Sequence, residues 1–155
     1  MAIDQAVLDE RVTEAVSFLA RVLPRYIAGL RHERRGGHGE FHLENPYEPG
    51  RSLGISTQGG EVTLWFGECH THFFEGVFSE ADLVGEMVVQ VVRLVIGDER
   101  SYSAWAGDAC LGGGWLRAGA EAREAFAHFP QADRLKVVGW SPSDDAEIRR
   151  GGPGG

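Results

Sequence analysis

The chain has 155 residues, of which 43% are hydrophobic and 25% charged, so its size and composition are those of one ordinary globular domain rather than a disordered or fibrous protein. Its formal charge of -8 argues against nucleic-acid binding, because phosphate recognition depends on clustered Lys and Arg side chains. The most apolar stretch, 87–96, is interrupted by Gln90 and Arg93 and is shorter than the ~20 residues of a membrane span, so we expect no membrane role.

The amino terminus and the cysteine content bear on location. The first residues lack the charged-then-apolar pattern of a signal peptide. Cys69 and Cys110 are the two cysteines of the chain. We therefore expect a cytoplasmic protein in a reducing compartment.

The first predicted element is an amphipathic helix. Apolar residues recur at three- and four-residue spacing from Leu8 to Leu23, and Asp4 is placed to cap the helix. Pro24 should end it, with another helical turn over 26–30. The side chains that follow are basic, and we interpret them as cations at a solvated helix end, with a phosphate-binding patch as the alternative: Arg25, Arg31, His32, Arg34, Arg35 and His38.

Next we expect a loop and a hairpin. Gly-Gly, Asn-Pro and Pro-Gly pairs predict a loop over 36–51, with a short strand at 41–43. Residues 52–56 and 61–74 flank a Gly-rich connection and predict a β-hairpin with a long second arm.

A second helix is predicted from Ser79. Ser79 and Asp82 match the serine and acidic positions of a capping box, and apolar residues follow to Val95. Gly97 is placed to end this largely buried helix. Its high β-branched content leaves a strand over 87–96 as the alternative.

The carboxyl-terminal third predicts a hairpin, a helix and a strand. Residues 102–105 and 109–115 enclose Gly107-Asp108, and the run of glycines at 112–114 indicates a bulge or a close backbone approach. A helix over 117–129 and a last strand over 135–140 follow.

These elements predict one α+β domain over residues 1–148, followed by a disordered Gly-rich tail over 149–155. Hairpin pairs imply an antiparallel sheet of about five strands, with helices packed mainly on one face.

The strand end around residue 70 holds the main candidate site. In a single strand, alternation would place Glu68, His70 and His72 on one side and Trp65 and Cys69 on the other. Two histidines at this spacing lie roughly 6.5 to 7 Å apart and could share zinc or another divalent metal, with Glu68 as a base or orienting group. The alternatives are hydrogen bonds to a loop or to Glu68, and contact with a partner. Cys69 would be a buried, inert thiol.

Further metal ligands would have to come from elsewhere in the chain. The candidates are Asp108, Cys110, His128 and Asp144, and none of them belongs to a recognisable metal-binding motif. We therefore expect no cofactor, with a divalent metal at His70 and His72 as the alternative.

Aromatic side chains supply the remaining binding candidates. Most of the four tryptophans should fill the core, and any that is exposed would anchor a protein interface. The complete set of binding candidates is Glu68, His70, His72, Phe74 and Trp140.

Two segments carry a resemblance to a known group of proteins. The sequence from Trp65 to Phe73, Trp-Phe-Gly-Glu-Cys-His-Thr-His-Phe, and the later Val138-Gly139-Trp140-Ser141 resemble small bacterial immunity proteins of polymorphic toxin systems. The resemblance implies a non-enzymatic protein that neutralises a toxin, and the acidic charge suits a basic toxin domain as partner. The alternative is a metal-dependent hydrolase or lyase that uses His70 and His72.

Overall fold

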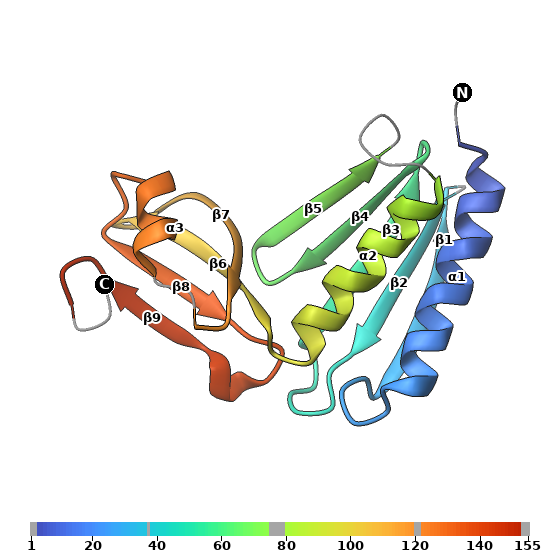
Figure 1. Cartoon of the computed structure of the whole chain (residues 1–155), viewed down its shortest axis with the longest axis horizontal. Coiled ribbons are helices and arrows are strands. Elements are labelled where there is room, and N and C mark those ends of the chain that lie inside the picture. The colour runs from blue at the N-terminus through green and yellow to red at the C-terminus, as the bar shows by residue number, and fades with distance from the viewer. Residues whose placement is uncertain (1–2, 37, 75–79, 120–121, 153–155) are drawn as a thin grey trace. The chain divides into compact units, whose positions relative to one another are not determined.

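A computed structural model describes residues 3–36, 38–74, 80–119 and 122–152 (Figure 1). The described residues form an α+β fold, as predicted, with strands in two antiparallel sheets rather than in one sheet of about five. The elements in chain order are α1 (Gln5–Val22), β1 (Gly29–Arg35), β2 (His38–Glu44), β3 (Ser52–Gln58), β4 (Glu61–Phe66), β5 (Cys69–Phe74), α2 (Glu80–Val95), β6 (Glu99–Ala106), β7 (Ala109–Arg117), α3 (Ala122–His128), β8 (Arg134–Val138), a 3-10 turn (Pro142–Asp144) and β9 (Ala146–Arg149).

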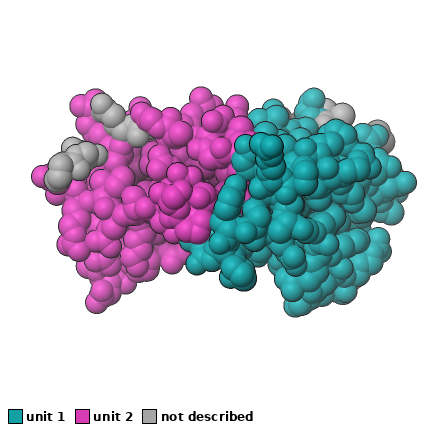
Figure 2. Space-filling view, turned by 90° about the horizontal axis from the view of Figure 1, so that it is seen from below, with its two compact units in different colours: residues 1–66, 70–92 teal, residues 67–69, 93–155 magenta. Residues whose placement is uncertain are grey.

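The chain divides into two compact units (Figure 2). Unit 1 comprises Met1–Phe66 and His70–Val92, and unit 2 comprises Gly67–Cys69 and Arg93–Gly155. One domain over residues 1–148, and helices on one face of a sheet, stay predictions. No helix in the described ranges is long and apolar enough to cross a membrane.

Helix α1 begins and ends as predicted. The Ala6 amide donates to the Asp4 carboxylate over 2.8 Å, which satisfies one of the free amides of the first turn. Leu23 caps the carboxyl end, directly before Pro24. The buried apolar residues Leu8, Val12, Val16 and Leu19 form one stripe, and α1 contacts β1, β2 and β3.

The prediction of a helical turn over 26–30 and of a loop over most of 36–51 is wrong. The chain runs into β1, and β2 pairs with it antiparallel from Gly29 opposite Glu44 to Arg35 opposite His38. The cross-strand ladder satisfies the backbone amides that a helical turn would have used, and the Ala28 amide already donates to the Glu44 carbonyl. The basic residues after α1 therefore lie on a strand.

Unit 1 contains a five-stranded sheet in the order β1-β2-β3-β4-β5. Side chains alternate between its two faces. The inner face holds the core, including Phe41, Leu43, Leu53, Ile55, Val62, Leu64 and Phe66, each at most 1% exposed. The opposite face, here called the outer face, carries His38, Glu40 and His42 on β2, Glu61, Thr63 and Trp65 on β4, and His70 and His72 on β5.

A carboxylate is buried on the inner side of unit 1. Asp9 of α1 is 5% exposed and accepts hydrogen bonds from the Thr57 hydroxyl and, over 2.9 Å, from the Gln5 amide. The Arg34 guanidinium lies 3.9 Å from its second oxygen. These partners compensate for the loss of water around the buried carboxylate and join α1 to β1 and β3.

The predicted long strand over 61–74 is two strands. Gly67 and Glu68 form a tight turn between β4 and β5, and Gly67 has a φ of 62°, which favours glycine. The two strands are neighbours in the sheet. Because the chain reverses here, residues before and after the turn do not follow one continuous alternation.

The second helix is present as α2, so the alternative of a strand over 87–96 is wrong. Leu83, Met87, Val91 and Leu94 are fully buried at helical spacing. Gly97, with a φ of 87°, follows the helix as predicted and donates its amide to the Leu94 carbonyl. The predicted cap at Ser79 lies outside the described residues.

Unit 2 contains a four-stranded sheet in the order β7-β6-β8-β9. The predicted hairpin around Gly107 is confirmed. The helix predicted over 117–129 is shorter, because β7 continues to Arg117 and α3 begins at Ala122. Arg149 ends β9 rather than starting a disordered tail, and residues 153–155 lie outside the described ranges. The core of this unit includes Tyr102, Leu116, Phe126, Leu135 and Val137.

The predicted close backbone approach at 112–114 is confirmed. The Cys69 thiol donates to the carbonyls of Tyr102 and Gly114, over 2.9 and 3.2 Å. A Cβ on Gly113 would meet the Tyr102 carbonyl oxygen and would lie 2.7 Å from the Cys69 sulfur. Glycine therefore provides the room for a buried thiol beside the β6–β7 pair.

Candidate functional site

A shallow cavity of about 520 Å³ lies on the outer face of unit 1. Four neighbouring strands contribute polar side chains and one indole, each at an outward position of its strand. The lining residues are His38, Glu40, Ser56, Gln58, Glu61, Thr63, Trp65, His70 and His72. We call this the outer-face cavity.

The predicted histidine pair lies in this cavity. The rings of His70 and His72 stand edge to face, with centroids 4.9 Å apart. Nδ1 of His72 contacts the Glu61 carboxylate and lies 3.1 Å from the Thr63 hydroxyl. In the tautomer that carries its proton on Nδ1, the ring donates to the Glu61 carboxylate and Nε2 is an acceptor.

Trp65 lies in the same cavity as the histidines, whereas a single strand would have put it on the opposite side. That expectation is wrong because the turn at Gly67 and Glu68 reverses the chain between them. Gly54 lies directly opposite Trp65 on β3, and a Cβ at Gly54 would be 3.4 Å from the indole. A side chain at position 54 would thus begin in van der Waals contact with the ring, which is 39% exposed.

The carboxylates of the cavity are shared with neighbouring cations. Glu40 lies 3.5 Å from the Arg35 guanidinium and 3.6 Å from the His42 ring. Arg35 in turn donates to Glu33 over 2.9 Å; this hydrogen bond lowers the pKa of Glu33 and raises that of Arg35. In the part of the chain that the structure describes, no Lys or Arg lines the cavity itself. The negative charge that the cavity presents to an approaching cation is therefore that of Glu61 and of Glu40, which Arg35 already neutralises in part.

The other predicted binding residues lie elsewhere. Glu68 is exposed in the β4–β5 turn and does not line the cavity. Phe74, 46% exposed, continues the outward positions of β5 beyond the lining residues. Trp140 is fully buried, so it offers no surface to a partner. Cys69 is also buried, as predicted.

Sequence reasoning missed His38, Glu40 and Trp65 as site residues. The signal for the first two was present, since His-Gly-Glu-Phe-His-Leu-Glu over 38–44 alternates polar and apolar or small residues with the period of a strand. The intervening Gly and the flanking Gly-Gly and Asn-Pro pairs favoured a loop. Strand pairing then placed these residues beside β3 and the histidines of β5.

The metal alternative needs at least one more ligand than the two histidines. Within the described ranges, no group of three or more His, Cys, Asp or Glu side chains is arranged to hold a metal ion. Asp108, Cys110, His128 and Asp144 belong to unit 2, and the structure does not assemble them into such a group.

Comparison with known proteins gives no family for this chain. No protein-family model matches it, and neither the curated proteins nor the solved structures contain a significant match.

Proposed function

We propose that this chain is a non-enzymatic binding protein whose outer-face cavity receives a basic side chain of a partner protein. The observation that carries the proposal is the half-exposed Trp65 in one cavity with Glu40 and Glu61. Tryptophan is the residue type most favoured at interface hot spots, and its ring attracts cations. The two carboxylates add charge complementarity to the same group.

The charge of the whole chain supports a basic partner. A net charge of -8 accelerates encounter with a positively charged surface and discourages acidic partners. The contacts at Trp65 would then set the rate of dissociation, since differences in affinity among related complexes lie mostly in that rate.

The specific form of this proposal is an immunity protein that neutralises a bacterial toxin with a basic surface. The resemblance of residues 65–73 to immunity proteins supports it, and these residues contribute Trp65, His70 and His72 to the cavity. A toxin would be inhibited by occlusion, without chemistry on the part of this chain.

The test has two stages. The tagged full chain is used to capture partners from its source cell, and any partner recovered in stoichiometric amount is identified and purified. Its dissociation constant is then measured for the wild type, for Trp65→Ala and for the double variant with Glu40→Gln and Glu61→Gln. We expect each variant to weaken binding at least tenfold, a change of about 1.4 kcal/mol.

Phe18→Ala is the matched control. Phe18 lies on α1, is 51% exposed and is not a lining residue of the cavity, so its loss should leave affinity unchanged. Recovery of no stoichiometric partner would contradict the proposal. So would a partner that binds Trp65→Ala and Phe18→Ala equally well.

A metal-dependent hydrolase or lyase is the second candidate. The contact between the Glu61 carboxylate and Nδ1 of His72 favours it, because metal-binding histidines usually donate their other nitrogen to such a group. Elemental analysis of protein purified without an affinity tag tests this candidate. Less than about a tenth of an equivalent of metal, with a melting temperature unchanged by a chelator, would exclude it.

A further inference from the structure

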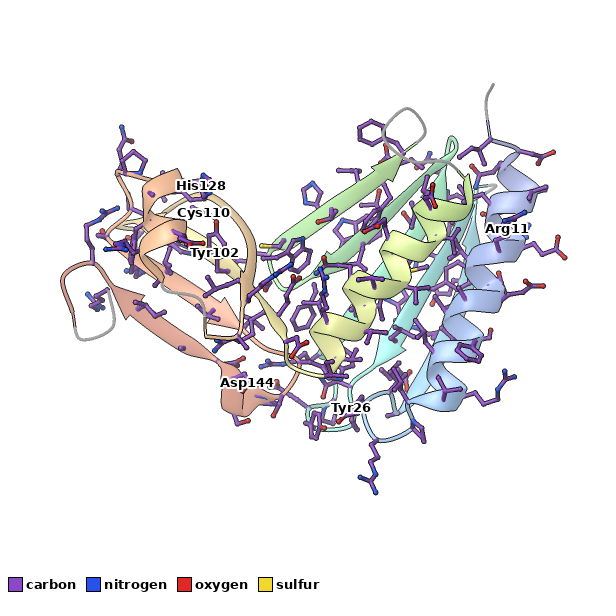
Figure 3. The ribbon with its side chains drawn as sticks, viewed as in Figure 1. Arg11, Tyr26, Tyr102, Cys110, His128 and Asp144 are labelled. Atoms are coloured by element: carbon purple, nitrogen blue, oxygen red, sulfur yellow. The ribbon has the colours of Figure 1, made fainter. Side chains whose placement is uncertain are left out.

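Two cationic side chains of unit 2 lie over one indole. The Nζ of Lys136 is 4.0 Å from the centroid of the Trp105 ring, and the guanidinium carbon of Arg134 is 5.8 Å from it. Arg134 lies directly opposite Trp105 in the β6–β8 pair, and Lys136 follows two positions later, so all three side chains share one face of the sheet. We call this cluster the Trp105 patch. Cys110, opposite Trp105 in the β6–β7 pair, marks this end of the sheet in Figure 3.

The indole of the patch is fixed by its own strand. Its Nε1 donates to the Ser103 hydroxyl over 2.8 Å, and Ser103, two positions earlier on the same face, is 5% exposed. The ring therefore lies along the strand. Lys136 is opposite Ser103 in the register, which brings its ammonium group over the ring. Attraction to the ring then restricts where both cations lie.

The charge of Arg134 lacks a counter-charge. Its Nε is buried and makes no hydrogen bond within the described residues. Neither Arg134 nor Lys136 forms an ion pair in the ranges that the structure describes. A guanidinium that has lost part of its hydration without gaining an anion is destabilised, because burial of a charge is costly unless the charge is paired. An anion at the terminal nitrogens of this half-buried side chain would compensate for that cost.

The acidic side chains beside the patch are engaged elsewhere. Glu147 lies opposite Lys136 in the β8–β9 pair, but its carboxylate is 2.9 Å from the Arg149 guanidinium. Asp133 directly precedes β8, and its carboxylate accepts the Gly107 amide over 2.7 Å. These contacts leave the two cations over the indole available to an anion from solvent.

We propose that the Trp105 patch binds the phosphate group of a small phosphorylated ligand. Arg134 donates hydrogen bonds to the phosphate oxygens from its terminal nitrogens, and Lys136 donates from its ammonium group. A phosphate monoester carries a charge of about -1.5 to -2 at pH 7, which matches two cations, whereas a carboxylate carries a single charge. Arginine and lysine both recognise phosphate, the first as a planar fork and the second as a point charge.

Charge and spacing restrict the ligand to a small one. The net charge of -8 repels an extended polyanion, and nucleic-acid binding depends on many more cationic contacts than this patch offers. The Cα atoms of positions 134 and 136 are about 6.5 to 7 Å apart along a strand, so two long side chains can reach the same phosphate group.

This site does not depend on the proposed partner binding. Trp105, Arg134 and Lys136 belong to unit 2, and none of them lines the outer-face cavity of unit 1. Substitutions in the patch should leave partner affinity unchanged, and Trp65→Ala should leave phosphate binding unchanged. Either proposal can therefore fail alone.

The test uses the full chain and phenyl phosphate as the probe, at about pH 7.5, where the monoester is mostly doubly charged. Lys136 is the only lysine in the sequence, so selective 13C labelling of lysine gives a side-chain signal that reports on the patch without assignment. We expect phenyl phosphate to shift this signal saturably, with a dissociation constant of about 5 mM or lower. Benzoate at equal ionic strength should bind at least about fivefold more weakly, because it carries less charge.

Two substitutions locate the phosphate group. Arg134→Gln and Lys136→Gln each remove one cation and keep a polar side chain, and each should weaken phenyl phosphate binding about 3- to 10-fold. The 31P relaxation of the ligand measures every variant, including the one without lysine. Arg21→Gln is the matched control and should bind as the wild type does, since Arg21 lies over the Phe18 ring of α1 in unit 1. Circular dichroism and melting confirm folding, and Lys136→Gln carries the test if Arg134→Gln does not fold.

Four results would overturn the proposal. The first is no saturable change up to about 50 mM phenyl phosphate. The second is an Arg134→Gln or Lys136→Gln protein that folds and binds as tightly as Arg21→Gln. The third is inorganic phosphate binding at least tenfold more tightly than the ester, which would make the patch a site for the free ion. The fourth is a hexaglutamate peptide binding at least tenfold more tightly than phenyl phosphate, which would make it a docking surface for an acidic protein segment.

Discussion

The two units differ in how far their reactive side chains are exposed to solvent. On the outer face of unit 1, His72 and Glu61 are 46% and 37% exposed and contact each other in reach of solvent. In unit 2, the Cys69 thiol and the Tyr102 ring are each 6% exposed, and the backbone around them is fitted to their shape. An exposed ion pair contributes little to the free energy of unfolding and can be contacted by a partner. A buried polar group contributes more to that free energy, and its contribution depends on its hydrogen bonds and packing. The difference predicts which substitutions affect folding and which affect binding.

The largest effect should follow from Gly113→Ala. The added Cβ would meet the Tyr102 carbonyl oxygen and the Cys69 sulfur, neither of which is the flexible end of a long side chain. We expect unfolding free energy to fall by about 3 kcal/mol or more, measured by urea denaturation.

Gly85→Ala is the control for this substitution. Gly85 lies within α2 and is exposed, and no atom lies within 4 Å of the position that the added methyl group would take. Alanine should therefore stabilise the helix by about 0.5–1 kcal/mol. A Gly113→Ala protein as stable as the wild type would refute the close packing of β6, β7 and Cys69.

Asp9→Ala should have the next largest effect. It leaves the Thr57 hydroxyl and the Gln5 amide without their acceptor on the inner side of unit 1. We expect a loss of about 2–3 kcal/mol in urea unfolding. Glu10→Ala on the exposed side of α1 should change stability by less than about 0.5 kcal/mol, and equal losses in the two variants would contradict the buried role of Asp9.

The buried thiol should make stability depend on pH. Burial raises the pKa of Cys69, and it also raises the pKa of Tyr102, so the folded protein favours the neutral form of each. The contribution of the thiol to stability is fully present below its unfolded pKa of about 8.5 and is lost as pH rises through the raised pKa of the folded state.

Unfolding measured between pH 7 and 10 checks this expectation. The wild type should lose up to about 1.4 kcal/mol per pH unit for this group above pH 8.5, and Cys69→Ala should lose that part of the slope. Cys110→Ala, which removes the exposed cysteine, should keep the wild-type slope. Identical slopes for all three proteins would refute the role of the buried thiol.

The smallest effect on stability should come from His72→Ala. Its pair with Glu61 is exposed, so we expect a change below about 1 kcal/mol in urea unfolding. If the outer-face cavity binds a partner, the same substitution should weaken that complex more than it weakens the fold. A loss of stability comparable to that of Gly113→Ala would instead make His72 a structural residue.

Local signals in the sequence predicted the parts of the fold that depend on neighbouring residues. The Asp4 cap, the apolar stripe of α1 and the hairpin at Gly107 follow from spacing and turn chemistry alone. The glycines at 112–114 also indicated a close approach, although only the structure identifies Cys69 as the group that approaches.

The outer-face cavity depended on one turn that sequence reasoning missed. Apolar residues continue on both sides of Gly67, so the pattern favoured one long strand. The turn brings Trp65 to the side of His70 and His72 and removes Glu68 from it. His38 and Glu40 join them only through pairing across β3, and such long-range register is not encoded in local periodicity.

The division of the chain has a consequence for biosynthesis. Residues 67–69 belong to unit 2, yet the ribosome releases them before any of Arg93–Gly155. The Cys69 thiol therefore has no hydrogen-bond acceptors from Tyr102 and Gly114 until these two residues have been synthesised. Until then it is a free thiol on a nascent chain, open to oxidation that the finished fold would resist.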